Sequence, residues 1–97
     1  MRREQAIATI QQHWATLRER HHVDSLSMFG SVARDEAGPE SDIDVLVTFD
    51  ADIGLFEFFA LQDDLEGILG CKVDLGTPDS LRPRVRDNIL REAIRVA

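Results

Sequence analysis

The stretch GSVARDEAGPESDID, residues 30–44, separates two short apolar runs of the chain. It begins with the small pair Gly30-Ser31 and ends with two aspartates, Asp42 and Asp44, which open the second apolar run. A charge that is buried without a partner is costly. Asp42 and Asp44 are therefore expected either to lie in water at the end of a strand or to bind a positively charged group.

The overall composition narrows the possible partners. The 97 residues are 43% hydrophobic and carry a formal net charge of -7. This length predicts a single domain over residues 1–97 with one modest core. An acidic surface repels nucleic-acid phosphates and anionic lipids, so we expect neither as a direct partner. The N-terminus lacks the apolar segment of a signal peptide, no stretch is long enough for a membrane span, and the expected location is the cytoplasm.

Hydrophobic periodicity predicts alternating helices and strands. The expected helices cover residues 2–20, 31–36, 55–69 and about 81–96, and the expected strands cover residues 25–29, 41–49 and 71–75. Interleaved helices and strands predict an α/β (α+β) domain of two layers, with a small mixed sheet of three to four strands and helices mainly on one face.

Two helices and the histidines carry more specific expectations. The helix at 55–69 has Phe56, Phe59 and Leu65 among its apolar positions. The helix at 81–96 is basic and amphipathic over its whole length, and its predicted apolar face includes the penultimate residue, Val96. The histidines have no cysteine or acidic partner at metal-ligand spacing and are predicted to be solvated at helix ends; they are His13, His21 and His22.

The lengths of the connections predict where the acids meet. Ten residues are too few for a parallel crossover, so the first two strands should be antiparallel, which brings Gly30 and Ser31 beside Asp42 and Asp44. The next connection contains a full helix and suits a parallel crossover. Side chains alternate along strands, so Asp42 and Asp44 share a face, and Asp74 of the third strand should join them.

Three close carboxylates repel one another unless a cation lies between them. Oxygen ligands favour a hard cation such as Mg²⁺, which also binds substrate phosphates, and two ions could lie about 3.5–4 Å apart. A glycine at position 30 lets backbone N–H groups approach a phosphate. The sequence therefore predicts a site for phosphoryl transfer, which needs positioning and charge neutralisation.

The pair Gly30-Ser31, ten intervening residues and then Asp42-Ile43-Asp44 resemble the signature of the DNA-polymerase-beta-like nucleotidyltransferase superfamily. Three segments resemble sequences of the minimal nucleotidyltransferase (MNT) group in particular: FGSVAR, SDIDVLV and LRPRVRDNILREAI. The resemblance implies the polymerase-beta-like fold. It also implies an antitoxin that pairs with a HEPN-domain ribonuclease toxin and transfers AMP from ATP to a tyrosine hydroxyl of that toxin.

The resemblance also implies roles for individual residues. Asp42 and Asp44 match the metal ligands, and Asp74 matches the third acid, which binds metal and activates the incoming hydroxyl. The triphosphate-binding turn is matched by Gly30 and Ser31. Arg34 follows one helical turn later, where it could contact phosphate or be a solvated helix arginine.

Other functions remain open from the sequence. The chain could neutralise its partner by contact alone, or it could modify a small molecule or an RNA end. Two features argue against a small molecule or an RNA end as the acceptor. We expect no second domain that could hold such an acceptor, and the net charge is acidic. Acidic residues in the loop 35–41 and the turn 76–80 border the predicted site, where they would attract a basic partner surface.

Overall fold

The computed structural model describes residues 2–34 and 42–97. In chain order the elements are α1 (Arg3–Gln12), α2 (Trp14–His21), β1 (Val23–Phe29), α3 (Gly30–Ala33), β2 (Ile43–Phe49), α4 (Leu55–Leu69), β3 (Val73–Gly76), the 3-10 helix η1 (Pro78–Ser80), α5 (Pro83–Glu92) and β4 (Ile94–Arg95). The predicted α/β (α+β) class is confirmed.

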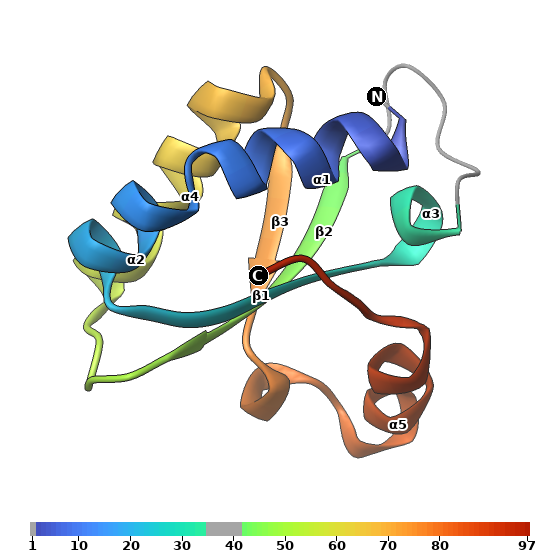
Figure 1. Ribbon diagram of the computed structural model, residues 1–97. Helices are drawn as coiled ribbons and strands as arrows, with labels where there is room; N and C mark the ends of the chain where they lie inside the picture. Colours follow the sequence, from blue (N-terminus) through green and yellow to red (C-terminus); the bar gives the residue numbers. More distant parts are fainter. Residues whose placement is uncertain (1, 35–41) are drawn as a thin grey trace.

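The four strands form one mixed sheet in the order β3-β2-β1-β4 (Figure 1). β1 and β2 are antiparallel, whereas β2 and β3 are parallel, as the connection lengths predict. β4 is a short fourth strand that pairs antiparallel with β1. Central strands β1 and β2 are therefore hydrogen-bonded on both sides, and β3 is an edge strand.

Helices α1, α2 and α4 cover one face of this sheet (Figure 1). Alternate strand residues point into the layer between helices and sheet, as the strand period of two requires. The strands and helices contribute the following fully or almost fully buried side chains: Ala6, Ile10, Leu17, Leu26, Met28, Ile43, Val45, Val47, Leu61, Leu65, Leu69, Val73 and Leu75. None of the described helices is both long and apolar enough to cross a membrane.

The opposite face of the sheet carries the intervening strand residues. Asp44, Leu46 and Asp74 lie on this second face because they alternate with the core positions. Helix α5 lies on this side of the sheet in Figure 1 but has no buried residue of its own. The second face is therefore more open than the first, and it presents the aspartates.

Two predicted helices differ from the helices of the structure. The predicted helix 2–20 is two helices, because His13 leaves the α-helical conformation and its N–H bonds the Ile10 carbonyl at 3.1 Å. The predicted helix 81–96 ends at Glu92. The chain then pairs with the edge of β1, and Val96 N–H donates to the Leu26 carbonyl at 2.8 Å, which buries Val96 in the sheet layer. Edge pairing satisfies backbone groups that a longer helix would leave open.

The short helix predicted at 31–36 is α3 where the structure describes it. Three predictions fall on residues outside the described ones. They are the rest of this helix, the start of the second strand at Ser41 and the acidic loop 35–41.

Candidate active site

Three aspartates approach one another at the end of the sheet where β2 begins. Asp44 is the direct partner of Asp74 in the parallel register of β2 and β3, so their side chains project from the same face. Asp42 is exposed and directly precedes β2. Phe29, the last residue of β1, is the antiparallel partner of Asp44, which places Gly30 beside this group. The structure thus brings the sequence-predicted acids and glycine together.

The electrostatics of Asp44 reflect this crowding. Burial, followed by the charge of Asp74, raises the pKa of Asp44 to about 6. A hydrogen bond between the two carboxyl groups and the charge of Asp42 act in the same direction, while the guanidinium of Arg34 acts against them. Asp44 is therefore a partly buried acid in a negative environment, which is the condition that a bound cation relieves.

Gly30 is required at its position for two reasons. Its φ is +73°, in the left-handed region that side chains disfavour. A Cβ at this residue would overlap Asp44 Oδ2 and lie 3.2 Å from Asp44 Cγ. The turn after β1 therefore packs its backbone directly against the partly buried acid, and a side chain at residue 30 would have to displace the Asp44 carboxylate.

Ser31 lies in α3, and Arg34 directly follows this helix. Ser31 is half-buried, and Arg34 is exposed. The Arg34 guanidinium donates to Glu92 Oε2 of α5 at 3.1 Å and also acts on the charge of Asp44. Glu92 was missed by the sequence analysis because 58 residues separate it from Arg34, and no local pattern links them.

Helix α4 fixes the position of β3 and hence of Asp74. Gln62 Nε2 donates to the Val73 carbonyl at 2.8 Å, and the Val73 N–H donates to Glu66 Oε2 at 3.0 Å. Both side chains lie one helical turn apart on α4, and they satisfy the backbone on the open edge of β3. The backbone next to the third acid is thus held in place by two side chains of α4.

Carboxylate oxygens are the donor set that Mg²⁺ prefers, and the repulsion around Asp44 favours a cation at this point. Within residues 2–34 and 42–97, however, no three acidic, histidine or cysteine side chains are already arranged around a common metal position. Asp44 and Asp74 instead act on each other, and the neighbouring Asp74 contributes to the raised pKa of Asp44. The residues fit a divalent cation by type and by location.

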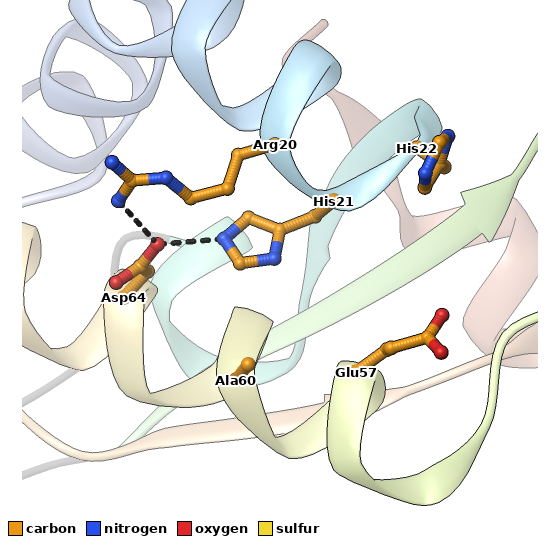
Figure 2. Close-up of a pocket in the computed structure, with 6 residues that line it drawn as sticks. All are labelled: Arg20, His21, His22, Glu57, Ala60 and Asp64. Atoms are coloured by element: carbon orange, nitrogen blue, oxygen red, sulfur yellow. Dashed lines mark hydrogen bonds and ion pairs between the residues drawn. The ribbon is translucent and has the colours of Figure 1, made fainter.

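A second cluster of ionisable residues lies at the other end of β1 (Figure 2). His21 is buried, and its Nε2 lies 2.6 Å from Asp64 Oδ2 of α4, which also accepts a bond from Arg20 at 3.3 Å. The prediction that His21 is solvated is therefore wrong. Its acidic partner is 43 residues away in the sequence, so only tertiary packing reveals the pair.

The profile of the nucleotidyltransferase domain matches residues 10–96 of this chain. The chain belongs to this family. The protein adenylyltransferase MntA of Thermococcus cleftensis is 38% identical to it over 96% of this chain and 94% of the relative. A relative from Methanocaldococcus jannaschii that is named for the same activity is 43% identical over 79% and 83% of the two chains. The predicted enzyme class, nucleotidyltransferase, is confirmed.

Solved structures support the fold. A structure described as a minimal nucleotidyltransferase matches with a TM-score of 0.81 and 39% identity, over 97% of this chain and 95% of that chain. A toxin–antitoxin complex with AMP-PNP matches at TM-score 0.73 and 18% identity, over 90% and 72%. A tri-AMPylated Shewanella oneidensis HEPN toxin in complex with its MNT antitoxin matches at 0.68 and 16%, over 98% and 71%. The resemblance to the polymerase-beta-like MNT group is confirmed.

Proposed function

We propose that this nucleotidyltransferase is the antitoxin of a HEPN-domain toxin, and that it neutralises the toxin by transferring AMP from ATP to a tyrosine hydroxyl. The observation that carries the proposal is the meeting of Asp44 and Asp74 in register on the open face of the sheet, next to the Gly30 turn. Phosphoryl transfer requires such a cluster of charge and positioning groups.

The relatives favour a protein as the acceptor. The Thermococcus cleftensis relative, which matches nearly the whole of both chains, is named a protein adenylyltransferase. Two structures with the same fold are described as toxin–antitoxin complexes, one with AMP-PNP and one with an AMPylated HEPN toxin. These names support ATP as the nucleotide and a HEPN toxin as the partner.

Each candidate residue has a proposed role. Asp42, Asp44 and Asp74 would hold Mg²⁺, two ions in the complete site, and the metal would supply charge neutralisation for the triphosphate of ATP. The Gly30-Ser31 turn holds the phosphates, since its backbone lies against Asp44. Arg34 exchanges part of its contact with Glu92 for a phosphate oxygen, which an exposed ion pair permits at little cost.

The proposed transfer is a single displacement at the α-phosphorus. The tyrosine oxygen forms a bond to this phosphorus while the bond to the oxygen that bridges to the β-phosphate breaks. Pyrophosphate leaves with that electron pair, and Asp74 accepts the hydroxyl proton. Asp74 suits this task because it is exposed at the edge strand, where an acceptor can reach it.

The test combines the purified chain, ATP, Mg²⁺ and a HEPN-domain protein as the candidate acceptor, with intact-mass measurement of that protein. We expect mass increments of whole AMP units, located on tyrosine by peptide sequencing. Asp44→Asn should leave the mass unchanged.

Two other results would contradict the proposal. Inhibition of the ribonuclease without any mass increment would mean that the chain neutralises its partner by contact alone. Transfer of AMP to an RNA end or to a small molecule, but not to the protein, would change the acceptor class.

A further inference from the structure

An ion pair joins the C-terminal ends of α3 and α5. Arg34 directly follows α3, and its Nη1 donates to Oε2 of Glu92, the last residue of α5, at 3.1 Å. The guanidinium of Arg34 also opposes the rise in the pKa of Asp44, so its charge acts on the group of three acids. Glu92 is therefore linked to the candidate active site through Arg34.

The ion pair contributes little to the stability of the fold. The side chains of Arg34 and Glu92 are 45% and 47% exposed. Water screens charges that are this exposed, and such pairs add little to the free energy of unfolding. Helix α5 also has no buried residue that the loss of the pair could disturb. The main effect of the pair is therefore expected on the orientation of the Arg34 side chain.

The backbone next to Glu92 is fixed, although α5 lies on the surface. Two residues after Glu92, Ile94 pairs with Met28 of the central strand β1. Val96 is buried, and its carbonyl accepts a bond from Gln11 Nε2 of α1 at 3.1 Å. The return of the chain to the sheet edge thus gives the Glu92 carboxylate a defined place beside α3.

The backbone at Arg34 is held as well, but its side chain is long. The Arg34 N–H donates to the Gly30 carbonyl at 3.2 Å, and Arg3 of α1 donates to the Ala33 carbonyl at 3.1 Å. An arginine side chain has many rotamers and loses much conformational freedom when it is ordered. A contact that orders it beforehand reduces the loss that would otherwise accompany ligand binding.

We propose that Glu92 is a positioning residue, which holds the Arg34 guanidinium beside the phosphate-binding turn before the nucleotide arrives. The inference rests on the proposed function, in which Arg34 contacts the triphosphate. A guanidinium carries five N–H donors in a planar fork, so it can contact the Glu92 carboxylate and a phosphate oxygen at the same time. Glu92 therefore increases the affinity for the nucleotide without touching it.

Charge alone predicts the opposite effect of Glu92. It adds a negative charge to a chain whose net charge is already -7, and the triphosphate is negative too. If Glu92 acted only through its charge, or if it competed with the phosphates for Arg34, its removal would strengthen nucleotide binding. The positioning role predicts weaker binding, so the sign of the change separates these explanations.

The test measures the binding of α,β-methylene-ATP with Mg²⁺ by calorimetry, because the methylene bridge prevents transfer. We expect Glu92→Ala to raise Kd about threefold to tenfold. The KM for ATP in transfer to a HEPN-domain protein should rise by a similar factor while kcat stays near the parental value, since this contact is made in both the ground state and the transition state. The variant should melt like the parent.

Two further variants isolate the role of Arg34. Asp87→Ala removes another exposed acid of α5, so it changes the net charge equally, and it should leave Kd unchanged or slightly lower. In a chain that already carries Arg34→Ala, the addition of Glu92→Ala should not raise Kd further, because Glu92 acts through Arg34.

Each other outcome has a defined meaning. The positioning role would be overturned by parental or tighter binding in Glu92→Ala, by an equal loss in Asp87→Ala, or by a full additional loss in the Arg34→Ala background. A melting temperature of Glu92→Ala far below the parental value, or no nucleotide binding by the parent chain, would also overturn it. Nucleotide binding that depends on both Glu92 and Arg34, without AMP transfer to the HEPN-domain protein, would support the positioning role and contradict the proposed acceptor.

Discussion

Gly30 illustrates how a single residue allows a charged site to be compact. Both Gly30 and Gly70 have positive φ, but only at Gly30 would a side chain meet another group, the Asp44 carboxylate. We expect Gly70→Ala to cost about 1 kcal/mol of stability, the usual penalty for the left-handed region, with transfer unchanged. Gly30→Ala should carry the same penalty and also abolish transfer, since Asp44 must move. Equal activity of the two variants in the mass assay would show that Asp44 does not need its observed position.

Asp44 is the residue at which charge and stability oppose each other. Its pKa in the folded chain is raised to about 6, so the ionised carboxylate weakens the metal-free fold at neutral and higher pH. Asp44→Asn should therefore melt at or above the parental temperature in EDTA at a pH near 8, while transfer is lost. A much lower melting temperature would identify Asp44 as a structural hydrogen-bonding residue.

At the level of elements, a polar pair joins α2 to α4, in which His21 is buried and Asp64 is partly exposed. The hydrogen bond with His21 lowers the pKa of Asp64 below its ordinary 3.8. A lowered pKa means that the ionised carboxylate stabilises the fold at pH values above 3.8. This contribution is lost as the pH falls through the lowered pKa of the folded chain. Asp64→Ala would also leave the buried His21 ring without its partner.

Asp64→Ala should therefore lower the free energy of unfolding by about 1–3 kcal/mol at neutral pH, and the deficit should shrink as the solution is acidified below 3.8. Urea unfolding at several pH values measures this deficit. Asp63→Ala, which removes the exposed neighbouring carboxylate, is the control and should have little effect. A deficit that stays constant with pH would show that packing, and not the charge of Asp64, joins the helices.

For the whole molecule, the net charge of -7 should oppose the binding of a nucleotide. A triphosphate brings further negative charge to a face that already carries Asp42, Asp44 and Asp74, and like charges at these distances repel strongly. ATP should therefore bind weakly in EDTA and at least tenfold more tightly with Mg²⁺ in calorimetry. Tight binding without metal would mean that the acids do not face the phosphates.

The whole molecule also determines which apolar residues are available to a partner. Leu61, Leu65 and Leu69 form the buried stripe of α4, whereas Phe56 projects from the opposite side. The apolar composition of this helix could be read from the sequence, but not which apolar residues remain uncovered. Which residues remain uncovered depends on how much of the α4 surface packs against the sheet, α1 and α2.

The geometry of strands and of short connections allowed much of the candidate site to be predicted from the sequence. The strand period of two places Asp42 and Asp44 on one face, and the short connection after Gly30 requires antiparallel strands, so the meeting of these residues followed from chain geometry. Only the tertiary structure decided the partial burial of Asp44, the burial of His21 against Asp64 and the pairing of Arg34 with Glu92. These contacts join residues far apart in the chain, and their energies depend on desolvation and distance, which exist only once the layers have packed.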